Sequence, residues 1–571
     1  MANYKTPGVY VEEISTLPAS VAPVATAIPA FVGYTELHST DKPVRITSLL
    51  EYREKFGVSK AEAISITLTV NGVDPTITDI TIADPAGGLS KYLLYYQLQM
   101  YFINGGGPCY IVSVDSYQED GSFDKGKILA AINKLEEEDE PTILLVPEAV
   151  MFTSAGDRAD INNALLNQCN KLQDRVAIMD VPVVTSNTVL QDATAFRNND
   201  VGMSYLKYGM AYYPSLKTTL VRYYDEDALV ITDNRGGAGS GAFHNFSLSV
   251  IPLGEQNALG KIVITNNANI DNDVFQIGTD TFTEGTDFDK DTSKNKTAAK
   301  LAEAITNAAS ANYEVIDQSG NTILIRATNP GAAGELDFLY TDSGSGVAAE
   351  LSGITLERVA ADTTLYNDIK KKLDTTYTLD LYPGGSMAGI YARVDRDRGV
   401  WKAPANVSVN GVKEPAVLVT HAEQEELNVN ATSGKSINAI RPFAGKGTLV
   451  WGARTLAGND NEWRYVPVRR FFNFMEESIQ KATEPSVFEP NTQATWTRLK
   501  AMIENFLTQL WSAGALAGST PQQAFFVNVG LGKTMTALDI LEGRLIIEVG
   551  VAAVRPAEFI ILKFSHKLQE S

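Results

Sequence analysis

Apolar runs alternate with amphipathic runs through the first half of the chain. Between Cys109 and Leu216, short apolar runs are separated by longer runs that carry one apolar face at helical spacing. The strand-like runs are CYIVSV, TILLVP, RVAIMDVP and GMAYYPSL, and the helix-like runs are KGKILAAINKLEEE and ADINNALLNQCNKLQ. This alternation predicts an α/β layered fold around a parallel or mixed sheet.

The segments before this block predict four further elements. Ala27–Glu36 has the pattern of a buried strand, and Ser48–Gly57 that of a short helix that ends at its glycine. Residues 62–84 contain β-branched alternation around an Asn-Gly turn, which predicts an inserted hairpin. Lys91–Gly107 is apolar on nearly every face, and a helix of that kind is buried.

The C-terminal part has the clearest helix signal. Trp463–Ile479 is expected to run from a strand into a helix, and residues 492–511 carry one apolar stripe at spacings of three and four. The stripe consists of Trp496, Leu499, Ile503, Phe506 and Leu510. Two later runs, AFFVNV and RLIIEVGVAAV, are expected to be core strands.

Residues 225–362 differ in character from their surroundings. They are rich in Asp, Thr, Asn and Gly, and they contain the strand-like runs VFQIG and NTILIRAT. An amphipathic helix between these runs presents Ala298, Leu301, Ala302, Ile305 and Ala308 on one face. We expect a small α/β module inserted at the surface.

Both ends of the chain carry a strand pattern without a nearby partner. No hydrophobic segment follows TPGVYVEEI (Thr6–Ile14) closely enough to form a hairpin with it. Near the C-terminus, EFIILKFSHKL alternates on two faces after Arg555-Pro556. We therefore expect arms that pair elsewhere in this chain or in another copy. The expected parts of this multi-domain α/β chain are an N-terminal linker arm at 1–26, an α/β domain with the hairpin at 27–224, the inserted module at 225–362, a C-terminal core domain at 363–554 and a C-terminal linker arm at 555–571.

Composition argues against some partners and some cellular locations. The 571 residues include 48 basic and 68 acidic side chains, and this net charge of −20 argues against nucleic acid, whose phosphates need a basic surplus. Cys109 and Cys169 lie in apolar runs and form no disulfide framework, which favours a reducing compartment. The uncharged segment Ile14–Thr35 contains three prolines and follows acidic residues, so we interpret it as an extended arm, with no signal peptide and no membrane insertion.

No catalytic, cofactor or metal site is predicted. The turns after the apolar strands lack the Gly-rich pattern of a phosphate site, and Gly530–Thr534 (GLGKT) lacks the first glycine of a P-loop. The four histidines are isolated, the acidic run around Asp289 departs from a calcium loop, and Gly384–Gly389 is expected to be a plain turn. The roles of five arginines stay open between internal ion pairs and contacts to other proteins: Arg393, Arg396, Arg398, Arg469 and Arg470.

Ordered motifs along the chain resemble the contractile tail sheath family of bacteriophage tails and extracellular contractile injection systems. The motifs that carry the resemblance are TPGVYVEEI, AFVGYTE, the NGG before CYIVSV, AYYPSL, AGIYARVDRDRGVWKAPAN, IRPFAGKGTLVWGARTL, WRYVPVRRFFNFMEESI and GRLIIEVGVAAVRPAEFI. They cover residues 1 to 60, 90 to 220 and 365 to 571. Residues 225 to 360 depart from the shortest members of the family.

The resemblance implies a structural subunit with no enzymatic activity and no cofactor. Subunits of that family form sixfold stacked rings around an inner tube protein, meet baseplate and terminator proteins, and contract to drive the tube through a membrane. They assemble in the cytoplasm and become part of a virion or an injection particle. The resemblance does not distinguish a phage from an injection system.

In that family the arms complete a β-sheet in neighbouring subunits, which is strand addition between chains. The inter-subunit residues that this implies are Val9, Tyr10, Val11, Glu12 and Ile14 in the N-terminal arm and Phe559, Ile560, Ile561, Leu562 and Phe564 in the C-terminal arm.

Three alternatives remain at this point. The N-terminal residues could pair with the core of their own chain. The chain could be another structural protein of a virion or a surface array, which would form flat lattices or closed rings. An α/β enzyme built on residues 109–216 rests on fold analogy alone.

Overall fold

The fold consists of two compact units, each formed by segments that are distant in sequence. A computed structural model describes residues 21–38, 40–72, 78–237, 243, 246–252, 257–308, 310–330, 336–344, 346–351 and 362–562. Unit 1 contains residues 1–59, 91–220 and 380–571, and unit 2 contains residues 60–90 and 221–379. This division groups the 62–84 hairpin with the segment after residue 220.

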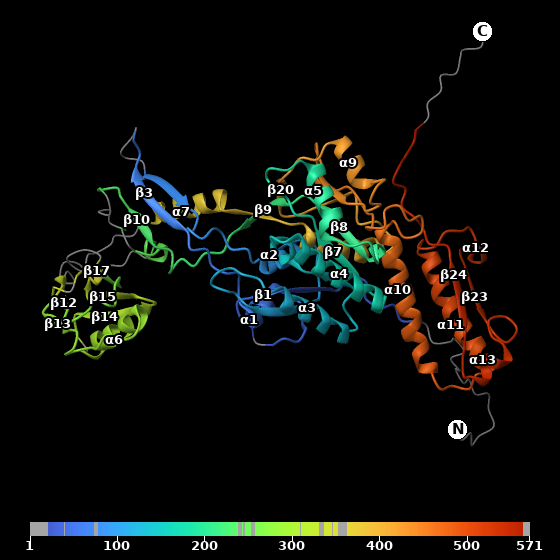
Figure 1. Ribbon diagram of the computed structural model, residues 1–571, viewed down its shortest axis with the longest axis horizontal. Helices are drawn as coiled ribbons and strands as arrows, with labels where there is room; N and C mark the ends of the chain where they lie inside the picture. Colours follow the sequence, from blue (N-terminus) through green and yellow to red (C-terminus); the bar gives the residue numbers. More distant parts are fainter. Residues whose placement is uncertain are drawn as a thin grey trace, which may run out of the picture. The chain divides into compact units, whose positions relative to one another are not determined.

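A nine-stranded sheet forms the centre of unit 1 (Figure 1). Its strands, in spatial order, are β19 (Val407–Ser408), β22 (Gly447–Val450), β21 (Asn438–Phe443), β8 (Gly209–Tyr213), β7 (Val176–Asp180), β6 (Ile143–Leu145), β1 (Pro29–Thr35), β5 (Cys109–Ser116) and β2 (Val44–Ile46). The strands from β5 to β21 are parallel, and antiparallel strands flank them at both edges. The predicted layered α/β fold is confirmed.

Helices cover both faces of this sheet. The helices of this layer are α1 (Leu49–Phe56), α2 (Leu94–Ile103), α3 (Lys125–Lys134), α4 (Ala155–Leu172), α5 (Val189–Ala195), α8 (Gly384–Arg398) and α9 (His421–Asn428). Helices α3 and α4 pack on the face of the sheet that carries Val32 and Tyr34 of β1, whereas α2 packs on the face that carries Phe31. The all-round apolar segment predicted as a buried helix is α2.

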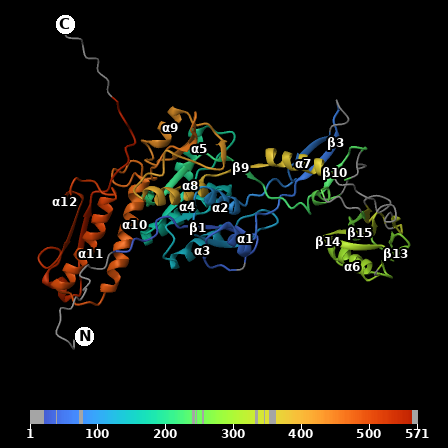
Figure 2. The same ribbon diagram turned by 180° about the vertical axis from the view of Figure 1, so that it is seen from behind.

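The C-terminal module of unit 1 is built from helices α10 and α11 and a strand pair, and both views show the two helices side by side (Figure 2). Its elements are α10 (Val466–Thr483), α11 (Gln493–Ser512), α12 (Pro521–Ala524), β23 (Phe525–Val529), α13 (Ala537–Leu541) and β24 (Ile547–Val551). Every residue of the predicted α11 stripe is buried. Strands β23 and β24 pair antiparallel. Of the two predicted core strands, β23 carries buried side chains, Val527 and Val529, whereas the side chains of β24 are half-buried or exposed.

Unit 2 holds two apolar cores. One lies between the hairpin β3 (Ser65–Val70) and β4 (Thr78–Ala83), strand β10 (Ile231–Asp233) and helix α7 (Thr363–Thr376). The other lies between helix α6 (Lys294–Asn307) and two small sheets. These sheets consist of β14 (Tyr313–Ser319), β15 (Thr322–Pro330), β11 (Asn257–Ile264) and β17 (Ala349–Leu351), and of β13 (Asp280–Thr283), β12 (Val274–Ile277) and β16 (Phe338–Thr341).

Two local predictions are corrected. The run Gly209–Leu216 was expected to be one strand, but β8 ends at Tyr213 because Pro214 has no N–H to donate to a ladder, and a separate strand, β9 (Leu216–Val221), follows. Gly384–Gly389 is not a turn but the first part of α8. A Cβ atom at Gly385 would lie 2.3 Å from the Gln97 carbonyl oxygen, so this glycine lets α8 approach α2 closely.

Candidate functional site

The predicted C-terminal arm presents four consecutive large apolar side chains to solvent. Phe559, Ile560, Ile561 and Leu562 are 70%, 80%, 79% and 71% exposed, and none of them pairs with a strand among residues 362–562. The other predicted arm residues, Val9, Tyr10, Val11, Glu12, Ile14 and Phe564, lie outside the described residues. Exposed apolar surface of this kind marks an interaction site.

The β23–β24 pair offers an open strand edge. Among the described residues, the further strand contacts of this region are two isolated bridges, Leu516–Ala553 and Leu531–Met535, and Phe526 of β23 is 50% exposed. A two-stranded sheet is marginally stable alone, and its unpaired N–H and C=O groups can accept another strand. The geometry therefore provides both a strand-forming segment and an edge that could receive one.

The carboxylate of Glu558 fixes the start of the C-terminal arm to unit 1. Glu558 Oε1 accepts hydrogen bonds from Arg454 Nε at 2.9 Å and Asn428 Nδ2 at 2.7 Å, while Oε2 accepts from Arg454 Nη2 at 2.5 Å and Tyr465 Oη at 3.1 Å. Burial acts to raise the pKa of Glu558, but the bonds from Arg454 and Asn428 outweigh it and hold the pKa below its ordinary value. We call residues 554–558 the C-terminal root.

The sequence analysis did not predict the contacts of Glu558. A signal was present, because Glu558 is the only charged residue between Arg555 and Lys563, within the otherwise apolar run that was assigned to the arm. A lone acid in such a run needs a partner when it is buried.

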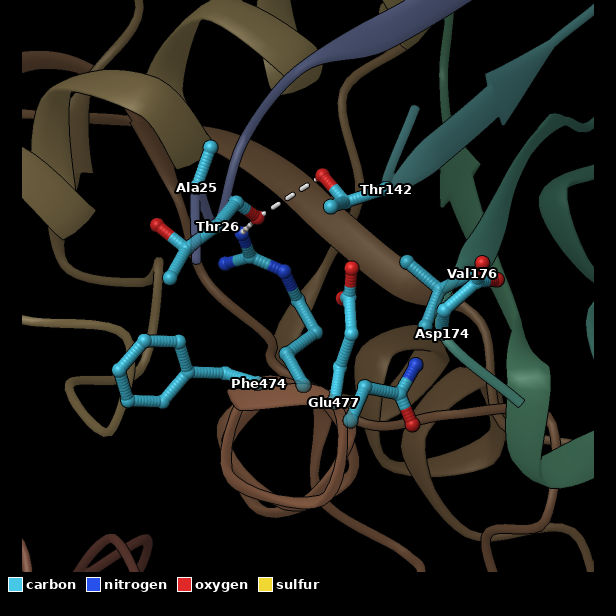
Figure 3. A pocket seen from close by; sticks show the side chains of 9 residues that line it. Ala25, Thr26, Thr142, Asp174, Val176, Phe474 and Glu477 are labelled. Atoms are coloured by element: carbon cyan, nitrogen blue, oxygen red, sulfur yellow. Dashed lines mark hydrogen bonds between the residues drawn. The ribbon is translucent and has the colours of Figure 1, made fainter. Parts of the chain in front are cut away.

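Residues 21–28, which we call the N-terminal root, lie against the C-terminal module (Figure 3). Val21 is buried in the apolar core that α10 and α11 share. The Thr26 carbonyl oxygen accepts hydrogen bonds from Arg470 Nη2 at 2.7 Å and from Thr142 Oγ1 at 3.0 Å. Figure 3 shows Thr26 and Thr142 on one side of a small cavity and Phe474 and Glu477 of α10 on another.

The open question about the five arginines has a partial answer. Arg470 pairs with Asp395 at 2.6 and 2.9 Å, and Arg469 stacks on the Trp463 ring with its guanidinium carbon 4.2 Å from the ring centre. Both guanidinium groups are buried and serve internal contacts. Arg393 Nη2 donates to the Ser408 carbonyl oxygen, and Arg396 is mostly exposed.

The place where a phosphate would bind in a doubly wound sheet is filled by a side chain of this chain. The strand order changes direction between β1 and β6, and ligands of such folds bind at that point. There Glu148 Oε1 accepts hydrogen bonds from Leu93 N at 3.0 Å and Leu94 N at 2.9 Å, at the start of α2. A Cβ atom at Gly33 would lie 2.4 Å from Glu148 Oε2, so the carboxylate fills the space above β1.

Glu148 makes the stability of the fold depend on pH. Burial raises the pKa of Glu148 to about 7, although the Leu93 and Leu94 N–H groups act to lower it. Its stabilising effect is therefore fully present below the ordinary pKa of a glutamate and is lost as pH rises through 7. We expect the free energy of unfolding to fall by about 3 kcal/mol between about pH 5 and pH 8 on account of this group.

Glu148→Gln is expected to remove that share of the pH dependence. Urea unfolding at both pH values measures it, and Asp180→Asn is a matched second variant because burial also raises the pKa of Asp180 to about 7. An unchanged pH slope in Glu148→Gln would show that the carboxyl does not titrate in this range.

The described residues hold no candidate metal site, P-loop or membrane-spanning helix. Among the described residues, no group of three or more His, Cys, Asp or Glu side chains is placed to hold a metal ion. Gly530–Thr534 forms a turn after β23, as expected for a loop lysine rather than a P-loop. No helix in the described ranges is both long and apolar enough to cross a membrane.

Comparisons with known proteins agree with these features. Residues 458–567 match the family model described as the phage tail sheath C-terminal domain. The tail sheath protein of Vibrio phage KVP40 is 28% identical over 135 residues, which are 23% of this chain and only 19% of that relative.

Two solved structures resemble the whole chain. The anti-feeding prophage helical sheath in its contracted state is 27% identical with a TM-score of 0.53, over 99% of this chain and 100% of that one. The sheath complex of an extracellular contractile injection system, PVC, also in its contracted state, is 26% identical with a TM-score of 0.53, over 99% of each chain.

The α/β sheet, the two-helix module and these matches together define a structural protein of tail sheaths. Over nearly its whole length the chain is similar to sheath proteins of contractile injection systems, and its residues 458–567 are similar to the C-terminal domain of phage tail sheaths.

Proposed function

We propose that this protein is the repeating subunit of a contractile sheath, in which copies are linked through their terminal arms. The sheath surrounds an inner tube in an extended state and shortens to drive that tube through a target membrane. New contacts between subunits in the shortened state supply the energy, without nucleotide hydrolysis.

One observation carries the proposal: the consecutive apolar residues Phe559–Leu562 are 70–80% exposed next to a module with an open sheet edge. A monomer gains nothing from such a segment, whereas strand addition to another copy buries its side chains and satisfies its backbone. The donor is the C-terminal arm of one subunit, and the proposed acceptor is the β23–β24 edge of another.

Contacts of this kind extend without closing. The donor segment and the acceptor edge are different surfaces of one chain, so each added copy exposes a new edge, and rings can stack into a helical tube. We propose sixfold rings, an inner tube protein in the lumen, and baseplate and terminator proteins at the two ends. Assembly in the cytoplasm precedes incorporation into a virion or an injection particle.

Electron microscopy of the purified protein over a concentration series tests the proposal. We expect hollow tubes that appear above a threshold concentration. A chain without residues 1–20 is expected to stay folded, with an unchanged circular dichroism spectrum, and to lose tube formation. Normal tubes from the shortened chain would contradict the role of the N-terminal arm.

The same experiment separates the rival functions. Flat lattices or closed rings of constant length would favour a surface-array protein. The enzyme alternative predicts thermal stabilisation by a nucleotide or a divalent metal. The carboxylate of Glu148 at the start of α2 argues against a nucleotide phosphate in that position.

A further inference from the structure

Helix α10 is bonded to the roots of both arms. Tyr465, the residue before its first turn, donates to Glu558 of the C-terminal root. Arg470, little more than one turn later, donates to the Thr26 carbonyl of the N-terminal root. Two arms that are far apart in sequence therefore converge on one helix.

Arg454, the residue that holds the C-terminal root, lies beside the start of α10. Val466 N, in the first turn, donates to the Ala453 carbonyl oxygen at 3.0 Å, next to Arg454. Arg454 is 4% exposed and holds the Glu558 carboxylate with two of its nitrogens. Ion pairs with this paired, buried geometry are stronger and more directional than neutral hydrogen bonds.

The N-terminal root is tied to the middle of the same helix. Val24 N donates to Ser478 Oγ at 3.2 Å, and Val21 is buried beside Phe471 and Phe474. Asp395 of α8 accepts two hydrogen bonds from Arg470, so the guanidinium group that donates to Thr26 has a fixed position.

From these contacts we infer that α10 is the element that carries tension between the two arms of a subunit. Between Tyr465 and Ser478 the load crosses about 20 Å of helix, at 1.5 Å per residue. The helix suits this role because it is fixed on both sides: Asn473 Nδ2 donates to the Arg175 carbonyl oxygen beside β7, and Phe474 packs against Phe506 of α11.

The inference deepens the proposed function, since in a sheath linked by arms each subunit is pulled at both ends by its neighbours. It assigns positioning roles to Arg454 and Arg470, which the sequence left without one. Rigid-body rearrangement then proceeds with the two exit points of the arms held at a constant separation.

Single-molecule pulling on the full chain tests the inference without requiring a sheath. Handles are attached at Ala22→Cys, an exposed position in the N-terminal root ahead of Val24 and Thr26, and at Ile561→Cys, an exposed position beyond the C-terminal root. The native cysteines Cys109 and Cys169 are buried. We expect Glu558→Gln to detach the C-terminal root roughly tenfold to hundredfold faster at a given force, as for loss of a charged hydrogen bond. Ser478→Ala is expected to accelerate detachment of the N-terminal root by a smaller factor.

A matched control lies off the route. Arg45 forms an exposed pair with Glu140, and Arg45→Gln is expected to leave the detachment rates unchanged. Wild-type rates in both Glu558→Gln and Ser478→Ala would overturn the inference, as would unfolding of the sheet before either root detaches.

The outcome is independent of the proposed function. If the wild-type protein forms no tubes but the roots detach as expected, the sheath proposal fails and the role of α10 stands. If tubes form and the variants pull like the wild type, the sheath proposal stands and the role of α10 fails.

Discussion

Replacing Ile560 and Leu562 together with aspartate is expected to abolish tube formation and leave the subunit folded. The two side chains are 80% and 71% exposed, so the substitutions remove no packing within the subunit. In a strand, residues two apart point to the same face, and burying two carboxylates there between subunits is prohibitively unfavourable. Sedimentation and electron microscopy at the concentration where the wild type forms tubes measure the effect.

Two controls accompany this prediction. Val347→Asp in unit 2 replaces an apolar side chain that is 66% exposed, and it is expected to leave assembly intact. Phe559→Asp with Ile561→Asp tests the opposite face of the same strand. Tubes of normal length from both arm variants would exclude Phe559–Leu562 as a contact between subunits.

Arg470→Met is expected to destabilise unit 1 by about 3–5 kcal/mol, since it leaves the buried Asp395 carboxylate without its partner. The side chains of Arg470 and Asp395 are 3% and 5% exposed, and the substitution also removes the hydrogen bond to Thr26. Urea unfolding followed by tryptophan fluorescence measures the loss, because Trp401 and Trp496 both belong to the C-terminal module or pack against it.

The double variant Arg470→Met with Asp395→Leu shows whether the unpaired Asp395 carboxylate or the lost contact to Thr26 causes the destabilisation. Without the orphaned carboxylate, most of the lost stability is expected to return. The exposed pair Arg45–Glu140 is the control, and Arg45→Met is expected to cost no more than about 1 kcal/mol. A double variant as unstable as Arg470→Met alone would show that the contact to Thr26, rather than the carboxylate, is decisive.

Periodic signals predicted most elements of unit 1. The strands at Cys109, Ile143 and Val176, helix α2 and the stripe of α11 follow from apolar patterns, because burial of one face or of all faces imposes those patterns directly. The hairpin at 62–84 follows from the β-branched alternation of its two strands, which pair antiparallel.

Sequence patterns failed where a contact between distant segments decided the outcome. Gly384–Gly389 forms a helix because α2 lies close beside it, and no local signal records that neighbour. The same holds for the roots, where Glu558 meets Arg454 and Thr26 meets Arg470 across more than a hundred residues of sequence. The pairing of the arms themselves stays a prediction, which rests on the family and on the exposed segment Phe559–Leu562.

The strand pairing in unit 2 has a consequence for how such a chain can change over time. Strands β11 and β17 are antiparallel neighbours, and Ile262 of the entering strand faces Leu351 of the leaving one. The intervening ninety or so residues, with their own apolar core, thus begin and end at nearly the same point. A short loop, or another domain whose termini lie close together, can therefore replace these residues while the rest of the chain keeps its fold. Insertions at this position would give every subunit of an assembly a different outer surface.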